Sequence, residues 1–160
     1  MTGSDLTTSL AQFLAYRPHQ ALFLLVHPQV SRLTAAAHHL HQQYPSWPHL
    51  ALSTSLAQSL RDIAPAQRPR QTPRLLASAI RQYNSGPLLC TDIDLLFEPA
   101  LQLDPLRLFL DASRQTVLIV AWPGIYQNNN LAYAVPEHAH YRTWSRPQLD
   151  ANYVVQLSDR

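Results

Sequence analysis

The stretch Pro87-Leu88-Leu89-Cys90-Thr91-Asp92-Ile93-Asp94-Leu95-Leu96-Phe97 decides the expected fold, because an apolar run here ends in two carboxylates. An apolar run without alternation is typical of a strand that is buried on both faces, as in a parallel sheet covered by helices. Open α/β sheets bind ligands at the carboxyl ends of their strands, where Asp92 and Asp94 would lie. A structural interpretation is equally favoured by this stretch alone: either carboxylate could cap the next segment.

Similar runs and amphipathic segments alternate along the rest of the chain. Strands are expected at residues 21–26, 49–53, 88–92, 116–122 and 152–157, with a stop at Pro123-Gly124 after the fourth and an edge hairpin or arm at 131–134. Helices are expected at residues 4–16, 31–44, 56–63, 73–83 and 104–110, with an exposed loop at 64–73. This alternation predicts an α/β fold of three layers, with about five mainly parallel strands and helices on both faces.

The composition restricts the chemistry. A chain of 160 residues fits one domain, in which residues 1–18 would hold an N-terminal helix. All twelve basic residues are Arg, so the chain has no Lys, and this excludes Schiff bases, a phosphate-loop lysine and a Ser-Lys dyad. The three glycines cannot build a glycine-rich phosphate loop. A formal net charge of +2 is too small to argue for nucleic acid by itself.

Targeting signals are not evident in the sequence. The N-terminus has no basic region followed by an apolar run, and no apolar stretch reaches the ~18 residues of a membrane-spanning helix. The single cysteine, Cys90, cannot form an intrachain disulfide and lies in an expected buried strand. We therefore expect a cytoplasmic protein without a membrane partner.

Residues 27–34 have the layout of a nucleotide-binding loop without its chemistry. The expected order is a strand, an eight-residue loop and a helix, as in the Walker A motif G-x-x-x-x-G-K-[ST]. In that frame His27 and Arg32 stand at the glycine positions, Leu33 stands at the lysine position, and only Thr34 matches. The helix N-terminus would still favour an anion, which Arg32 could assist. In P-loop proteins the acid corresponding to Asp92 helps to hold Mg²⁺.

Two other groups of residues are candidate sites. Arg68, Arg70 and Arg74, in the region 61–74, could contact phosphates of DNA or an acidic partner, although a solvated loop is favoured because no aromatic residue is interleaved. Histidines cluster at 38–41 and, beside Glu137, at 138–140. Neither cluster has the spacing of a known metal motif, so a metal hydrolase is the weakest hypothesis.

Three segments together resemble a known family. They are Thr91-Asp92-Ile93-Asp94-Leu95-Leu96-Phe97-Glu98-Pro99 with Leu103-Asp104-Pro105-Leu106, then Ser113-Arg114 before Val117-Leu118-Ile119-Val120-Ala121-Trp122-Pro123-Gly124, and last Leu131-Ala132-Tyr133-Ala134-Val135-Pro136-Glu137-His138 with Tyr141. Over about residues 87–157 the chain resembles BrxF, the small P-loop protein of type 3 BREX phage-defence systems. The N-terminal half matches this family only in layout.

The resemblance implies an AAA-like P-loop core, ATP with Mg²⁺ as ligand, and partners from a multi-protein antiviral system. It assigns the Walker B acid to Asp92, the position of the catalytic acid to Asp94, the sensor strand to the segment ending at Trp122, and the Mg²⁺-binding hydroxyl to Thr34. Arg32 would contact phosphate. Because the loop lysine and glycines are replaced, we expect no hydrolysis and no required cofactor.

Three functional hypotheses follow. The first is a non-hydrolysing subunit, a pseudo-ATPase, that acts in assembly or regulation of a defence complex. The second is a DNA-binding module that uses the Arg-rich region 61–74, and the third is an unorthodox ATPase in which Asp94 is catalytic. Association into a homo-oligomer is compatible with each of them.

Overall fold

The computed structural model describes residues 3–83 and 86–159. Its α-helices are α1 (Gly3–Tyr16), α2 (Val30–Gln43), α3 (Leu52–Leu60), α4 (Arg68–Arg81) and α5 (Pro105–Ala112). Its strands are β1 (Leu22–His27), β2 (His49–Ala51), β3 (Leu88–Thr91), β4 (Leu118–Gln127), β5 (Asn130–Tyr133), β6 (Arg142–Ser145) and β7 (Val154–Gln156). Short 3₁₀ helices are η1 (Pro65–Gln67), η2 (Asp94–Phe97), η3 (Pro99–Leu101) and η4 (Ala151–Tyr153).

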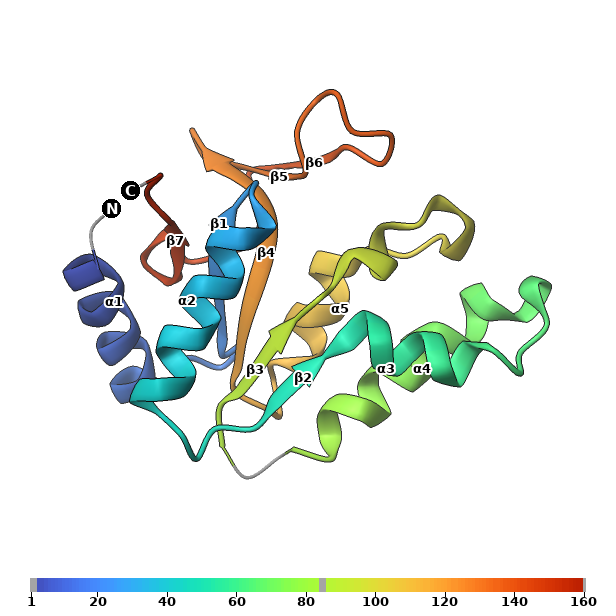
Figure 1. The fold of residues 1–160 in the computed structure, drawn as a ribbon, viewed down its shortest axis with the longest axis horizontal. Coiled ribbons are helices and arrows are strands. Elements are labelled where there is room, and N and C mark those ends of the chain that lie inside the picture. Colours follow the sequence, from blue (N-terminus) through green and yellow to red (C-terminus); the bar gives the residue numbers. More distant parts are fainter. Residues whose placement is uncertain (1–2, 84–85, 160) are drawn as a thin grey trace.

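Five parallel strands form the centre of the sheet, in the order β2-β3-β4-β1-β7 (Figure 1). Strand β4 is paired with β1 on one side and with β3 on the other, so that Val120 lies opposite both Leu24 and Cys90. Strands β5 and β6 form an antiparallel hairpin on the far end of β4. The described fold therefore confirms an α/β class with a mainly parallel sheet.

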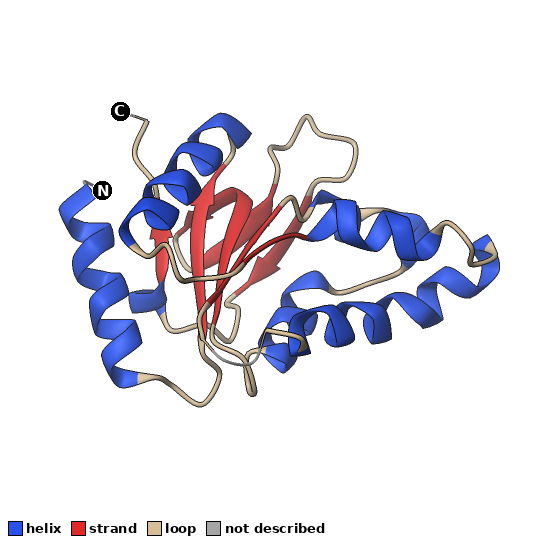
Figure 2. Cartoon of the chain, turned by 60° about the horizontal axis from the view of Figure 1, so that its bottom comes forward, coloured by secondary structure: helices blue, strands red, loops and turns tan. Residues whose placement is uncertain are grey.

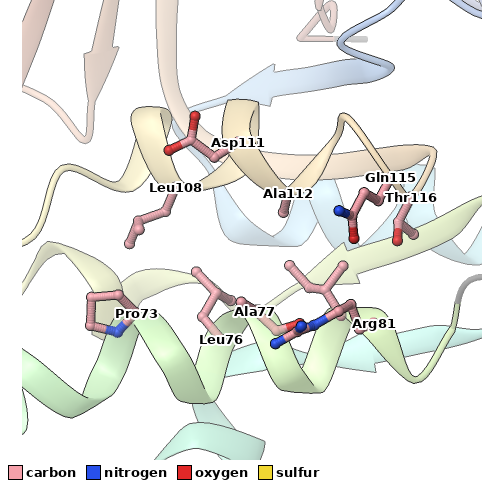
Figure 3. Close-up of a pocket in the computed structure, with 10 residues that line it drawn as sticks. Pro73, Leu76, Ala77, Arg81, Leu108, Asp111, Ala112, Gln115 and Thr116 are labelled. Carbon is pink, nitrogen blue, oxygen red and sulfur yellow. The ribbon is translucent and has the colours of Figure 1, made fainter.

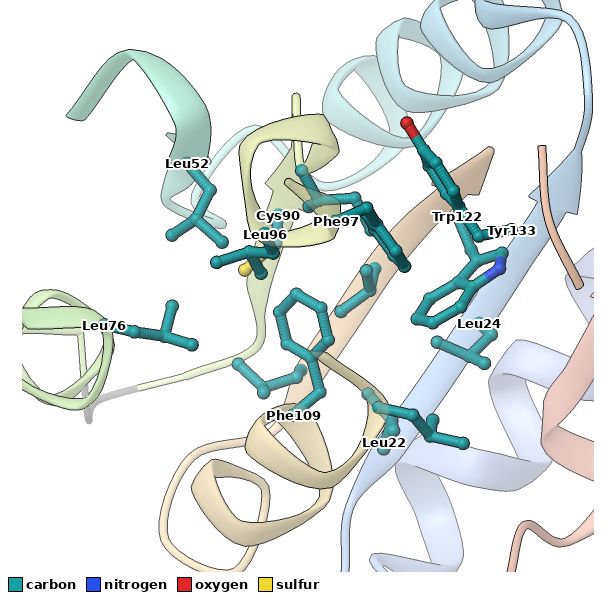
Figure 4. Close-up of a cluster of buried hydrophobic side chains, with 14 of the residues drawn as sticks. Leu22, Leu24, Leu52, Leu76, Cys90, Leu96, Phe97, Phe109, Trp122 and Tyr133 are labelled. Carbon is teal, nitrogen blue, oxygen red and sulfur yellow. The ribbon is translucent and has the colours of Figure 1, made fainter. Parts of the chain in front are cut away.

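Helices cover both faces of this sheet (Figure 2). On one face α1 and α2 contribute Phe13 and Leu40 to an apolar cluster with Phe23 of β1. On the other face α4 and α5 contribute Leu76 and Phe109 to a second cluster, which Figure 4 shows together with the side chains of the sheet. The continuous apolar runs of β1, β3 and β4 are explained by this arrangement, because both faces of each strand are buried.

Helix α5 begins where the sequence predicts. The Asp104 side chain accepts a hydrogen bond from the Arg107 amide, and Pro105 occupies the first turn, where its missing N–H costs nothing.

The segment 64–73 is not the exposed loop that the sequence suggested. It contains η1 and the first turns of α4, with Pro69 in the opening turn and Pro73 inside the helix. An internal proline removes one backbone hydrogen bond. The burial of Thr72, Leu76 and Ile80 along one face of α4 opposes that cost and holds the segment as a helix.

The stop expected at Pro123-Gly124 is also wrong, because β4 continues to Gln127. Pro123 pairs with β1 and Gly124 with β5, so these residues lie where the parallel pairing ends and the antiparallel pairing begins. A Cβ on Gly124 would lie only 1.8 Å from the Ala132 carbonyl oxygen, so any other residue would have to displace the paired strand here. The edge hairpin at 131–134 is confirmed, whereas its second strand, β6, was not anticipated.

None of the helices in the described parts of the chain is both long and apolar enough to cross a membrane.

Candidate functional site at the carboxyl edge

The carboxyl ends of β1, β3 and β4 meet at one edge of the sheet, which we call the carboxyl edge. After β3 the chain turns sharply at Asp92, whose φ of 56° is in the left-handed region that Asp tolerates better than most residues. A cavity of about 150 Å³ lies at this edge. It is lined by Val30, Leu33, Thr34, Thr91, Asp92, Ile93, Asp94, Ala121 and Pro123.

The Asp92 carboxylate caps helix α3. Its Oδ2 accepts hydrogen bonds from the Thr54 amide at 3.2 Å and from the Thr54 hydroxyl at 2.9 Å. The Asp92 carbonyl also accepts a hydrogen bond from the Ser53 amide at 2.6 Å. Helix α3 has no cap from its own preceding residue, Ala51, so Asp92 supplies the acceptors that the free amides of its first turn require. The negative charge at a helix N-terminus is also favourable. Asp92 therefore has a structural function in the free protein.

Asp94 is bound to the hairpin of β5 and β6. The Tyr133 hydroxyl donates a hydrogen bond of 2.6 Å to Asp94 Oδ1. The Tyr133 ring stacks on Phe97 with centroids 3.6 Å apart. Burial, followed by the hydrogen bond and the charge of Asp94, raises the pKa of the Tyr133 phenol, so this hydroxyl remains a donor at neutral pH. The second carboxylate thus fixes the hairpin against the carboxyl edge.

The turn between β1 and α2 is much shorter than a Walker A loop. Only Pro28 and Gln29 separate β1 from α2, so the expected eight-residue loop is wrong. The short turn is held by His27, which is 1% exposed. Its Nδ1 accepts a hydrogen bond from the Gln29 amide at 2.9 Å. The His27 side chain therefore occupies the Gln29 amide, a backbone donor of the kind that a phosphate-binding loop offers to its ligand.

The C-terminal segment lies beside the same turn. His27 Nε2 is 2.7 Å from Asp159 Oδ1, and because Nδ1 is an acceptor, Nε2 carries the proton and donates it. The Arg32 guanidinium donates a hydrogen bond to the Asp159 carbonyl. Arg32 consequently contacts the chain's own C-terminal segment and does not line the cavity beside Asp92.

Of the predicted ligand residues, the structure brings Thr34, Asp92 and Asp94 together at the cavity and leaves Arg32 outside it. The fit to a nucleotide is poor. Cavities that enclose ligands usually measure about 300–1,000 Å³, at least twice the volume of this cavity. The turn between β1 and α2 is also too short to surround phosphates. Within residues 3–83 and 86–159 no group of three or more His, Cys, Asp or Glu side chains could hold a metal ion. The small cavity and the short turn do not fit the phosphates of a nucleotide.

Trp122 also has a structural environment. Its indole N–H donates a hydrogen bond of 3.0 Å to the Ala132 carbonyl, and its ring packs edge-on against Phe97 and Trp144. The side chain is fully buried, so at the end of the expected sensor strand it joins β4 to the hairpin.

The Arg-rich region forms part of a helical arm made of α3, η1 and α4, which extends away from the sheet (Figures 1 and 2). Arg68 is half-buried, and its Nε donates a hydrogen bond to the Ile63 carbonyl at 3.0 Å, which ties the two halves of the arm together. Arg70 and Arg74 are exposed and lie one helical turn apart on α4. Only these two of the three predicted arginines are thus free of a structural contact among the described residues.

The sequence reasoning missed three residues that shape the carboxyl edge: His27, Thr54 and Asp159. Thr54 follows a short strand and could have been considered as a partner for an acid at a neighbouring strand end. The contact between His27 and Asp159 joins residues 132 positions apart, and no local pattern predicts it.

No protein-family model, no curated protein and no solved structure matches the chain.

Proposed function

We propose that the protein is a non-hydrolysing, P-loop-like subunit of a bacterial antiviral defence system of the BREX type, and that it acts in the cytoplasm through assembly or regulation. One observation supports the proposal that the protein does not hydrolyse ATP. The place where phosphates would be held is closed by a two-residue turn, with His27 bonded to Gln29.

The positions of three strands support the proposal of a P-loop-like core. The resemblance assigns the sensor strand to the segment ending at Trp122 and the Walker B acid to Asp92. Here β4, which ends its parallel pairing near Trp122, lies between β1 and β3. Asp92 then follows β3 as a Walker B acid would.

The chemistry of phosphoryl transfer argues against turnover. Enzymes of this class rely on a loop, a lysine and Mg²⁺ to offset the charge of the transferred phosphoryl group. Removal of one such electrostatic donor typically costs about 3 kcal/mol of barrier. This chain has no lysine, and Arg32 contacts the C-terminal segment, so several of these contributions are missing at once.

A role in defence is tested by phage infection. Deletion of the gene should sensitise its host to phage, and both the wild-type gene and its Asp92→Asn variant should restore resistance, because no hydrolysis is needed. Asp92→Asn keeps an oxygen acceptor for Thr54 and removes the charge that a Walker B acid requires. Resistance that is lost with Asp92→Asn, although the variant protein is folded and as abundant, would refute a non-hydrolysing role. Unchanged phage sensitivity on deletion would refute the defence role itself.

A DNA-binding module is the second candidate, because Arg70 and Arg74 are exposed on the same face of the arm. Phosphate contacts by these side chains predict an affinity for duplex DNA that falls steeply with salt. The double variant Arg70→Gln/Arg74→Gln should reduce both the affinity and the salt dependence, whereas Arg114→Gln, at an exposed position outside the arm, should change neither. If the wild-type chain binds no DNA at low ionic strength, this candidate fails.

A further inference from the structure

The loop of residues 134–141 joins β5 to β6 and projects beyond the end of the sheet (Figure 1). Rings and arginines alternate through this loop and β6, as His138, His140, Tyr141, Arg142, Trp144 and Arg146. Such interleaving is typical of sites for single-stranded nucleic acid, because bases stack on the rings while the cations contact phosphates. The Arg-rich region 61–74 has no rings between its arginines, so the hairpin has a feature that the arm lacks.

A row of ring contacts connects the loop to the buried core. Phe97 and Tyr133 are both buried and stack with their centroids 3.6 Å apart. The Tyr133 ring meets the exposed His138 ring edge-on at 5.5 Å, and His138 in turn lies 5.6 Å from His140. The core therefore supports the two histidine rings at the surface and holds them in place before a ligand binds.

Three hydrogen bonds fix the backbone of the same loop. The His138 amide donates to the Val135 carbonyl at 2.9 Å, and the Tyr141 amide donates to the His138 carbonyl at 3.2 Å. The His140 amide donates to Nδ1 of His138 at 2.9 Å. A preorganised loop loses little conformational entropy on binding. Tyr141, at the end of this loop, is 40% exposed, so its ring is accessible to a base.

Arginines flank the rings at the two ends of β6. Arg142 lies opposite Tyr133 in the hairpin, and its guanidinium donates a hydrogen bond to the Leu103 carbonyl and lies over the Trp144 ring. Arg146 directly follows β6 and is exposed, and its side chain makes no hydrogen bond or ion pair with the part of the chain that the structure describes. The Arg146 charge is therefore available to a phosphate.

We propose that this loop and β6 bind single-stranded nucleic acid, with a base stacked on Tyr141 and phosphates in contact with Arg142 and Arg146. The exposed carboxylate of Glu137 in the loop opposes phosphate, so stacking contributes more to the affinity than charge does. A duplex binds more weakly here, because its bases are already stacked on one another. The inference does not depend on the proposed function, and it concerns a different surface from the Arg-rich arm.

The test is fluorescence anisotropy of the intact chain with labelled oligothymidylate and oligouridylate of about 12 nucleotides, and with a duplex of the same length. Both single strands should bind at least ~10-fold more tightly than the duplex, and a preference between them distinguishes DNA from RNA. Tyr141→Ala should weaken binding of the single strands ~10-fold, which corresponds to about 1.4 kcal/mol and is expected for the loss of one stacked base. Tyr141→Phe retains a ring and should bind as the wild type does.

The charge contribution is measured from the salt dependence. Arg146→Gln should reduce the slope of log affinity against log salt by about 0.7, the value for one phosphate contact on a single strand. Arg81→Gln is the matched control, because it removes another exposed arginine, from the wall of the groove between α4 and α5 (Figure 3). This control and the double variant Arg70→Gln/Arg74→Gln should leave single-strand binding unchanged.

Several results would overturn the proposal. The single strands could fail to bind at about 50 mM salt, where phosphate contacts are strong, or the duplex could bind as tightly as they do. Tyr141→Ala could bind with the wild-type affinity while its urea midpoint shows that it is folded, so that the ring is not used. Finally, Arg70→Gln/Arg74→Gln could abolish single-strand binding, in which case the arm and not the hairpin holds the nucleic acid.

Discussion

The capping function of Asp92 predicts a defined order of stabilities for substitutions at this position. The side chain accepts two hydrogen bonds from Thr54 at the start of α3, and the backbone φ is 56°. Removing a helix cap costs about 1 kcal/mol, and holding an ordinary residue in the left-handed region costs about 1–2 kcal/mol. Asp92→Ala loses the cap and also the tolerance of Asp for this conformation, so it should destabilise the fold by about 2 kcal/mol.

Two other substitutions separate these contributions. Asp92→Gly loses the cap but adopts the positive φ freely, so it should cost about 1 kcal/mol. Asp92→Asn keeps an acceptor oxygen and also tolerates this conformation, so it should cost about 0.5 kcal/mol or less. The expected order of stability is therefore wild type, then Asn, then Gly, then Ala. Asp111→Ala, which removes an exposed carboxylate paired with Arg107, should change stability by less than about 0.5 kcal/mol.

Urea unfolding followed by tryptophan fluorescence measures these differences, because Trp122 is fully buried. A double-mutant cycle of Asp92→Ala with Thr54→Val should give a coupling energy of about 0.5–1.5 kcal/mol, as expected for residues in direct contact. A stability of Asp92→Ala within about 0.5 kcal/mol of the wild type, or no coupling to Thr54, would refute the capping function.

Three further predictions concern other parts of the fold. His49 is an exposed residue, and partial desolvation, followed by the charge of His41, lowers its pKa. Its small contribution to stability is therefore present above pH ~6.5 and is lost as the pH falls through the folded-state pKa. His49→Gln should slightly reduce the decrease in urea midpoint between neutral and mildly acidic pH, and an identical decrease in both proteins would contradict this. Burial raises the pKa of the Cys90 thiol to about 12, so a thiol reagent should label the native chain at least ~1,000-fold more slowly than the unfolded chain; rapid labelling under native conditions would show that β3 is not a central buried strand. Gly124→Ala should destabilise the fold by about 1–3 kcal/mol, because the added Cβ would overlap the Ala132 carbonyl; unfolding at the wild-type urea concentration would argue against the pairing of β4 with β5.

The sequence predicted the sheet because its central strands are unusually clear. The expected strands at 21–26, 88–92 and 116–122 contain apolar runs without alternation, which are typical of strands buried on both faces. The helix that starts at Asp104-Pro105 was predicted for a similar local reason, since its cap and first turn are encoded by adjacent residues.

Other features depend on contacts that no local pattern contains. The prolines of 65–73 indicate a loop by themselves, and they are accommodated in η1 and α4 because the helix buries one apolar face. Asp92 and Asp94 were correctly expected at the carboxyl edge, but their partners, Thr54 and Tyr133, come from distant segments. The length of the turn after His27 was overestimated because a Walker A frame was imposed on residues that do not form its loop.

The most direct test of the central proposal, that the carboxyl edge does not bind a nucleotide, is a thermal unfolding measurement with and without ATP and Mg²⁺. A ligand present at a hundred times its Kd stabilises the folded state by about 2.7 kcal/mol. In a chain of this size each kcal/mol raises the melting temperature by about 2–4 °C. We predict no change in melting temperature at millimolar ATP and Mg²⁺, with no heat of binding in a parallel titration. A rise of several degrees that disappears in Asp92→Asn would contradict the account.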